Sequence, residues 1–158
     1  MALREMRIQG DPVLEKKCKP IKEMTPKLAA LIEDMLDTMY EESGVGLAAP
    51  QVGMLKRIVV IDIGEGPYVM INPRILESSG EQTGQEGCLS VPGKAGIVTR
   101  PNFVKADALD ENMDLYIIEA EGLLARAICH ELDHLDGILY TTHVQGELME
   151  VKYEEDEE

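Results

Sequence analysis

The sequence predicts an α+β fold in a single domain, and three observations support this prediction. Apolar residues recur at helical spacing over residues 25–42, and a second helix is expected over residues 122–136. Between them lie short segments rich in β-branched and apolar side chains, which are typical of strands. The order helix, strands, helix favours an α+β fold over alternating β-α-β units. A length of 158 residues is enough for one hydrophobic core.

The first helix has recognisable ends. Thr25 is a suitable N-cap, and Pro26 suits the first helical position. The apolar face of the helix is expected to pack into the core. Gly44 lies just beyond the helix, where a left-handed backbone is often required.

Four segments between the helices are predicted to be strands. Residues 57–63 and 68–72 are rich in β-branched and apolar side chains, and Pro73 is expected to end the second of them. Residues 103–109 and 115–120 flank a turn-like acidic segment, so we predict that they form a hairpin.

The charge and hydropathy of the chain exclude several classes of protein. With 30 acidic and 15 basic side chains, the formal net charge is −15, and no basic patch is available for nucleic acid. No apolar run approaches the ~18–20 residues of a membrane span. The N-terminal segment lacks the apolar stretch of a signal peptide. We therefore expect a cytoplasmic protein that binds no membrane and no specific nucleic acid.

The three cysteines, without a secretion signal, argue against a disulfide framework. Cys18 lies among lysines in an expected exposed loop, where positive charge could lower its thiol pKa, but we interpret it as incidental to function. Cys129 precedes His130, but on a helix its side chain points about 100° away, which makes it a poor co-ligand. Cys88 lies in the glycine-rich segment 85–93, where a metal or ligand can approach closely, with a buried structural thiol as the alternative.

The segment from His130 to His134 has the pattern H-E-x-x-H on the second predicted helix. Histidines four residues apart project from one helix face, one turn apart, as two imidazoles must to share a metal ion. Glu131 lies at the edge of the same face, where it can reach water at the metal without being a ligand. Two surface histidines on an amphipathic helix are the alternative. A catalytic site also needs a third protein ligand from elsewhere.

The other faces of this helix are predicted from its periodicity. The face expected to be buried carries Leu124, Ala127, Ile128, Glu131 and Leu135. The opposite face, expected to be polar, carries Arg126, Cys129 and Asp133. The two histidines therefore border the core, where imidazoles and a carboxylate are costly unless they are satisfied. A metal ion would satisfy all three.

Residues 44–53 form a third segment of interest, with glycines and small residues suited to a loop beside another backbone or a substrate. Gln51 stands in an otherwise apolar stretch, and its amide could donate to an oxygen that becomes negatively charged. A glycine-rich turn with a surface glutamine is the alternative. A phosphate-binding loop is excluded because no Lys-Ser/Thr follows the glycines.

Together these segments resemble the peptide deformylase family, whose motifs are G-x-G-x-A-A-x-Q, E-G-C-x-S and H-E-x-x-H in that order. In this sequence the motifs are residues 44–51, 86–90 and 130–134, and the resemblance extends over nearly the whole chain to about Tyr140. It implies an α+β fold with mixed or antiparallel sheets around a central helix that carries H-E-x-x-H. It also implies a metal hydrolase that removes the formyl group from the N-terminal methionine of new polypeptides and releases formate.

The resemblance further implies the roles of individual residues. Cys88, His130 and His134 would bind one divalent ion, usually Fe²⁺ in this family and replaceable by Zn²⁺, Ni²⁺ or Co²⁺. The catalytic groups would be Glu131 as general acid and base, with Gln51 and the backbone N–H of Leu89 binding the formyl oxygen. The substrate is expected to contact Val45, Gly46, Leu124 and Ala127.

Residues 1–146 are expected to form the single catalytic domain and residues 147–158 an acidic tail. The tail has seven acidic side chains and one lysine, a net −6 of the total −15, and we expect it to be disordered. It is either a solvated end or an interaction segment. The expected partners are N-formylmethionyl nascent peptides, with a transient ribosome contact that the acidic end would weaken, since family members often end in a basic helix.

Two other functions remain as alternatives. One is another H-E-x-x-H metallopeptidase, which would need a further ligand downstream, and His143 lies beyond the helix-ending Gly137. The other is a non-catalytic module with a structural metal, but such sites usually have four protein ligands rich in cysteine.

Overall fold

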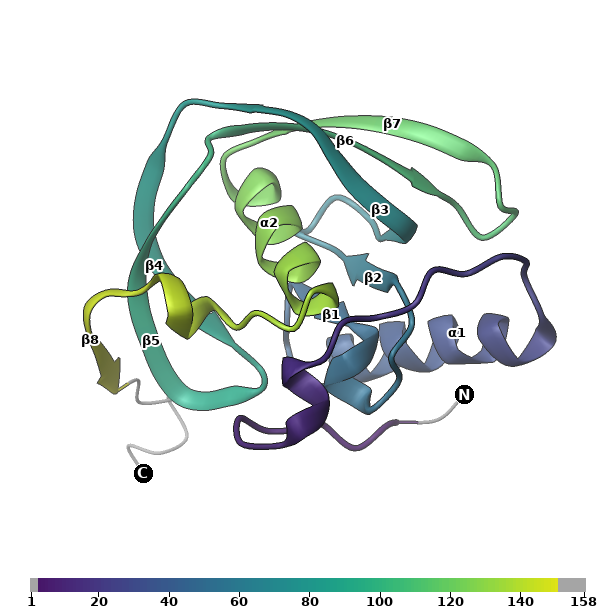
Figure 1. Ribbon diagram of the computed structural model, residues 1–158, viewed down its shortest axis with the longest axis horizontal. Coiled ribbons are helices and arrows are strands. Elements are labelled where there is room, and N and C mark those ends of the chain that lie inside the picture. Colours follow the sequence, from purple (N-terminus) through teal and green to yellow (C-terminus); the bar gives the residue numbers. More distant parts are fainter. Residues whose placement is uncertain (1–2, 151–158) are drawn as a thin grey trace.

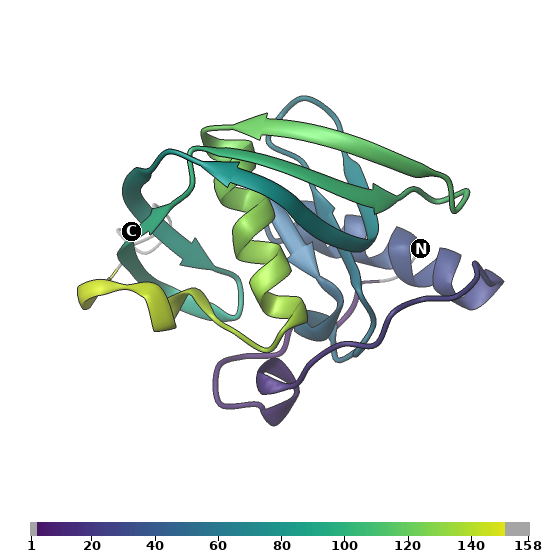
Figure 2. The same ribbon diagram turned by 45° about the horizontal axis from the view of Figure 1, so that its top comes forward.

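The computed structural model describes residues 3–150 and confirms the α+β class. The described part contains two α-helices and two antiparallel sheets (Figure 1). The larger sheet has five strands in the order β1-β2-β3-β6-β7, and the smaller has three in the order β4-β5-β8. Helix α2 lies between the two sheets, as the resemblance implied for the helix that carries H-E-x-x-H (Figure 2).

The strands are β1 Gly46–Ala48, β2 Ile58–Ile61, β3 Tyr68–Ser79, β4 Gln82–Cys88, β5 Val91–Arg100, β6 Phe103–Leu109, β7 Leu115–Glu121 and β8 Gln145–Glu150. The helices are α1 Pro26–Glu41 and α2 Leu123–Leu135, with short 3-10 turns at η1 Pro12–Glu15, η2 Ala49–Val52 and η3 Tyr140–His143. The predicted helices and the predicted hairpin, β6 and β7, are all present. Strands β1, β4, β5 and β8 were not predicted, and β1 lies within residues 44–53, which were expected to be a loop.

Helix α1 begins as predicted, but its end differs. The Thr25 side chain accepts a hydrogen bond from the backbone N–H of Leu28 at 3.1 Å, and Pro26 follows it. The left-handed residue after the helix is Ser43, with φ of 56°, rather than Gly44. Gly44 instead permits a close approach, because a Cβ there would lie 2.7 Å from Cδ1 of Leu89.

Strand β2 packs against one helix on each of its two faces. Val59 and Ile61 pack in the cluster around α2, whereas Ile58 and Val60 pack in the cluster around α1. A strand covered on both faces has a continuous apolar sequence instead of an alternating one. Each of these side chains is fully buried and contributes roughly 1.5–3 kcal/mol to folding. The helices therefore cover opposite faces of the larger sheet.

Strand β3 continues well beyond Pro73, which was predicted to end it. The register with β6 shifts between Ile71 and Arg74, and Asn72 has φ of 51°, so the chain bulges at this point. A bulge accommodates proline because the missing N–H is not needed by the ladder. The Asn72 side chain bonds the backbone N–H and carbonyl of Ile21 at 2.8 and 2.7 Å, which holds the bulge in place.

Strand β8 includes the first residues of the expected acidic tail. Residues 147–150, expected in the tail, belong to β8, which pairs antiparallel with β5. The ammonium of Lys94 on β5 lies 3.1 Å from the carboxylate of Glu150, so one acidic charge has a partner in the sheet. The rest of the expected tail, 151–158, lies outside the described residues. Within residues 3–150, neither α-helix combines the length and the hydropathy that crossing a bilayer requires.

Candidate active site

Helix α2 and the end of strand β4 bring together three side chains that could hold a metal ion. Cys88 Sγ lies 3.3 Å from Nε2 of His134, and the ligand atoms of Cys88, His130 and His134 all lie within 4.8 Å of one another. The two imidazole rings are 5.1 Å apart and buried, while Cys88 is half-buried. A thiolate and two imidazoles are donors that suit Zn²⁺ and related first-row divalent ions.

The two histidines of this cluster have different electrostatic surroundings. Burial lowers the pKa of His130, but the Cys88 thiol and the Glu131 carboxylate outweigh it and raise that pKa well above its ordinary value. Burial, together with the charge of His130, lowers the pKa of His134 to about 3, so its imidazole is neutral and has a lone pair to donate. The residues present therefore fit the divalent ion that the motifs imply.

Glu86 orients His130, although it was not among the predicted site residues. Its Oε1 lies 2.7 Å from Nδ1 of His130, so Nδ1–H donates to the carboxylate and Nε2 is left to bind a metal. Burial alone would raise the pKa of Glu86, but the hydrogen bonds from His130 and Arg100 outweigh it and lower the pKa to about 2. An acidic residue two positions before a cysteine ligand was the feature of the sequence that could have identified it.

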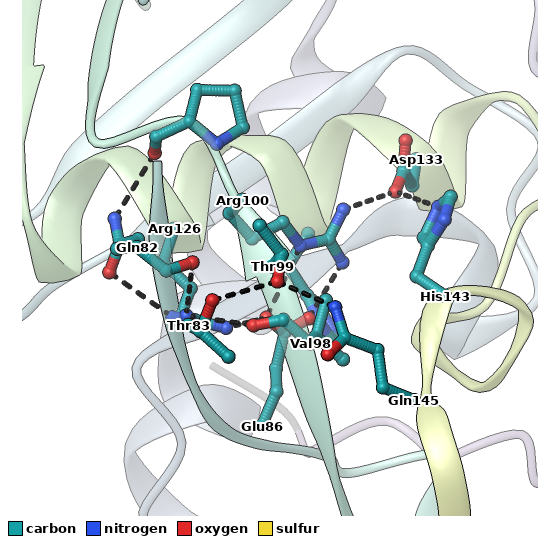
Figure 3. A network of polar contacts seen from close by, with 12 residues as sticks. Gln82, Thr83, Glu86, Val98, Thr99, Arg100, Arg126, Asp133, His143 and Gln145 are labelled. Carbon is teal, nitrogen blue, oxygen red and sulfur yellow. Dashed lines mark hydrogen bonds and ion pairs between the residues drawn. The ribbon is translucent and has the colours of Figure 1, made fainter. Parts of the chain in front are cut away.

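On the face of α2 that was predicted to be polar, Arg126 and Cys129 are buried and Asp133 is half-buried, and a network of ion pairs covers this face (Figure 3). Arg100 donates to Glu86 through Nη2 at 2.7 Å and to Asp133 through Nη1 at 2.7 Å. Arg126 donates to Glu86 through Nη1 at 2.6 Å. Because each guanidinium has a carboxylate partner, the side chains of Arg126 and Cys129 on α2 can face the smaller sheet instead of solvent. Periodicity did not predict this burial because the ion-pair partners, Glu86 and Arg100, come from β4 and β5.

Glu131 lies beside the metal-binding cluster and is almost fully buried. Burial raises its pKa to about 7, and its Oε1 has no hydrogen-bond partner among the described residues. A carboxyl group with a pKa near neutrality can both accept and return a proton. Gly46 on β1 leaves room for this side chain, because a Cβ there would lie 2.5 Å from Oε2 of Glu131.

Gln51 is buried, which contradicts the alternative of a surface glutamine. Its Oε1 accepts the backbone N–H of Ala48 at 2.9 Å, and this bond directs the amide nitrogen the other way. The nitrogen lies 3.1 Å from Oγ of Ser90 and 3.6 Å from Sγ of Cys88. The amide N–H groups therefore point towards the cluster, and the one in the long 3.6 Å contact with Cys88 can turn to an oxygen atom there.

A cleft of about 950 Å³ opens onto these side chains. The predicted residues that line it are Val45, Gly46, Gln51, Cys88, Leu89, Ala127, His130 and Glu131. Leu124 is instead buried in the core, and Leu123 lines the cleft. Leu123 shares a helix face with Ala127 and Glu131 at spacings of four residues, whereas Leu124 is rotated by about 100°.

Three other candidate residues lie outside the cluster. Cys18 is buried, contrary to the expected exposed loop, and burial raises its pKa to about 11, which agrees with an incidental role. Burial also raises the pKa of Cys129 to about 11. His143 lies 3.1 Å from the carboxylate of Asp133, so it is not the downstream ligand that another H-E-x-x-H metallopeptidase would need.

Comparisons with known proteins agree with this geometry. The polypeptide deformylase family model matches residues 3–149. The chain belongs to the polypeptide deformylase family. A peptide deformylase of Agathobacter rectalis is 68% identical over 158 residues and covers 100% of both chains. One of Lachnoclostridium phytofermentans is 62% identical and covers 100% of this chain and 99% of its own.

Solved deformylase structures share the fold. The crystal structure of peptide deformylase from Thermotoga maritima has a TM-score of 0.90 at 39% identity, covering 92% of this chain and 100% of its own. That of Synechococcus elongatus, in complex with actinonin, has a TM-score of 0.88 at 42% identity, covering 90% and 79%. This chain is therefore a hydrolase of protein biosynthesis that removes the N-formyl group from nascent polypeptides. The deformylase family is metal-dependent, in agreement with the Cys/His/His cluster.

Proposed function

We propose that Cys88, His130 and His134 hold one divalent ion and that Glu131 carries the proton during hydrolysis of N-formylmethionyl peptides. The observation that supports this most is the convergence of three donor atoms within 4.8 Å beside a buried carboxyl group whose pKa is about 7. The donors leave a coordination position open, as catalytic rather than structural sites do. When bound, the ion lowers the pKa of water and polarises the formyl oxygen.

The protein groups divide the remaining chemistry among them. Glu131 accepts a proton from the attacking water, whose oxygen forms a bond to the formyl carbon. As negative charge develops on the formyl oxygen, the amide of Gln51 and the backbone N–H of Leu89 donate hydrogen bonds to it. Glu131 then returns the proton to the leaving nitrogen as the carbon–nitrogen bond breaks. The products are formate and a free N-terminus.

The apolar part of the cleft is the proposed position of the methionine side chain. Leu123, Ala127 and Val45 offer apolar surface beside the cluster, and Gly46 also lines the cleft. Leu123 and Val45 are exposed, at 52% and 45%, although both are large and apolar, so a substrate would cover surface that is otherwise costly to leave in water.

Ferrous iron is the proposed ion in the cell, with Zn²⁺, Ni²⁺ or Co²⁺ as replacements. The resemblance to the family supports iron, and the donor set of one thiolate and two imidazoles accepts all four ions. Because Cys88 is only half-buried, an oxidant can reach its sulfur. Activity of the iron form is therefore expected to decline in air, while the nickel form persists. Equal loss of both forms in air would argue against a ferrous site.

The proposed location is the cytoplasm, where nascent chains leave the ribosome, with only transient contact between enzyme and ribosome. A net charge of −15 opposes attraction to ribosomal RNA, so this contact is expected to be weak. Co-sedimentation with ribosomes at low and moderate salt tests it. Tight association that survives added salt would contradict the proposal.

The decisive experiment combines anaerobic metal analysis with formate release from a formyl-methionyl peptide. Cys88→Ser is expected to lose tight metal binding, because a neutral hydroxyl is a far poorer donor than a thiolate. Cys129→Ser is the matched control and is expected to retain the metal, because Cys129 lies outside the cluster. Full metal retention in Cys88→Ser would refute the ligand assignment.

A further inference from the structure

Glu86 accepts as many hydrogen bonds as a carboxylate can. Its Oε1 lies 2.7 Å from both Nδ1 of His130 and Nη2 of Arg100. Its Oε2 lies 2.6 Å from Nη1 of Arg126 and 3.2 Å from Nε of Arg100. An ionised carboxylate has about four lone-pair sites, so all of them are used. The carboxylate cannot rotate without weakening one of these bonds.

Arg126 is anchored by groups that take no part in the metal cluster. Its Nη2 donates to the backbone carbonyl of Val98 at 3.1 Å, and its Nε lies 3.4 Å from the side-chain oxygen of Gln82. Gln82 in turn donates to the carbonyls of Pro101 and Gly122 at 3.1 and 2.7 Å. The guanidinium is therefore fixed between α2 and the strands β4 and β5.

The two arginines that bond Glu86 differ in their other partners. Arg100 also bonds a second carboxylate, that of Asp133, and Asp133 in turn bonds the exposed imidazole of His143. The remaining partners of Arg126, in the part of the chain that is described, are neutral oxygen atoms. Arg126 therefore holds the Oε2 side of Glu86 without competition from another anion.

We propose that Arg126 is a positioning residue for the metal site, because it locks Glu86 in the orientation that receives Nδ1–H of His130. This inference rests on the proposed role of His130 as a ligand. Without Arg126, Oε2 would keep only the 3.2 Å bond from Arg100, and the carboxylate could tilt. The ring of His130 would then lose its fixed direction. Partners that orient metal-binding histidines in this way typically change metal affinity by 10–100-fold when they are removed.

The test measures how tightly the enzyme holds Co²⁺, by competition with a chelator. Arg126→Met keeps an unbranched stem of similar length but removes every donor, and it is expected to weaken Co²⁺ binding by roughly 10-fold, the lower end of the range for such partners. The absorption bands of bound Co²⁺ should change as well, because the direction of an imidazole ligand changes. Arg126→Lys retains the charge without the planar fork, so it should recover only part of the affinity.

Arg74→Met is the matched control. Arg74 also forms a two-pronged ion pair, with Asp107 at 2.9 and 3.0 Å, but it pairs strands β3 and β6 away from the cluster. Its removal should leave both Co²⁺ affinity and the absorption bands unchanged. Loss of affinity in this variant too would show that general destabilisation, rather than Glu86, explains the effect.

A double-mutant comparison tests whether Arg126 acts through Glu86. In a Glu86→Gln background, Arg126→Met should weaken Co²⁺ binding no further, because the carboxylate it holds is already gone. A lower thermal midpoint with unchanged affinity and unchanged bands would overturn the proposal and leave Arg126 as a structural link. If Arg126→Met does not fold, Arg126→Lys alone decides between the same outcomes. Failure of the ligand assignment itself is recognised separately, by a Cys88→Ser variant that still binds Co²⁺ normally.

Discussion

The contact between Gly46 and Glu131 makes the role of the buried carboxyl group testable by adding a single methyl group. Gly46 has no positive φ, so alanine is compatible with its backbone. A Cβ at this position would lie 2.5 Å from Oε2, 2.9 Å from Cγ and 3.0 Å from Cδ of Glu131. All three distances are at or below the closest approach that side chains normally show. Gly46→Ala must therefore displace the Glu131 side chain.

The size of the displacement follows from these distances. Ordinary contact between a methyl carbon and a carboxylate oxygen begins near 3.4 Å, so relief of the 2.5 Å contact requires a shift of about 1 Å. A misplacement of about 1 Å at a catalytic group typically costs roughly 10²-fold in rate. Because Glu131 is only 4% exposed, the shift has to occur within a packed site. We expect kcat to fall by about this factor while the metal content is unchanged.

The assay is steady-state hydrolysis of a formyl-methionyl peptide, with metal content measured on the same samples. Gly84→Ala is the matched control, because a Cβ there meets its nearest atom, Nη2 of Arg126, at an ordinary distance of 3.5 Å. It should retain nearly normal kcat. A normal kcat in Gly46→Ala would refute the reasoning about Glu131. A raised KM with unchanged kcat would mean that the methyl group obstructs the substrate and leaves Glu131 in place.

Three further predictions follow from burial and from the pKa shifts. Glu131→Gln should retain the metal while kcat falls by roughly 10²–10⁴, and near-normal turnover would assign the base to another group. Cys18 and Cys129 should react slowly with a thiol reagent at pH 8, since both are buried and burial raises each pKa to about 11; rapid labelling of either in the folded protein would contradict this. Burial raises the pKa of Tyr116 to about 12, so the unfolded chain ionises first and stability is lost as the pH rises from about 10 to 12. Urea unfolding at pH 8 and pH 11 should show Tyr116→Phe losing less stability over this interval than the unsubstituted protein, and equal losses would exclude Tyr116 as the cause.

The parts of the fold that were predictable are those whose patterns are local. Helix α1 has its N-cap, its proline and its apolar stripe within one segment, and β6 and β7 are joined by a short acidic turn. The two histidines were predictable as neighbours because helical geometry alone places residues four apart on one face. Cys88 was different, because its proximity to them depends on the path of the whole chain. Its candidacy came from its glycine-rich surroundings and from the family motif.

Strands β4 and β5 could not be predicted from their own composition. Gln82–Cys88 is rich in glycine and polar residues, and such residues are depleted in strands. These strands exist because they pair with each other and pack on α2, and neither condition is visible in a short window of sequence. The same limit applies to Leu123 and Leu124, since an apolar stripe predicts a buried face but not the edge at which a cleft begins.

The ion-paired face of α2 shows that local sequence patterns also fail to predict residues that matter to the candidate site. Periodicity assigns Arg126 and Asp133 to solvent because an unpaired buried charge is costly. Their ion-pair partners remove this cost: Glu86 lies 40 residues from Arg126 along the chain, and Arg100 lies 33 residues from Asp133. No local sequence pattern can therefore predict these pairs. Yet Glu86 is also the group that orients His130. The same side chains therefore hold the smaller sheet against α2 and orient His130, the proposed metal ligand. Substitutions that loosen the packing of β4 or β5 on α2 should accordingly weaken metal binding before they unfold the protein.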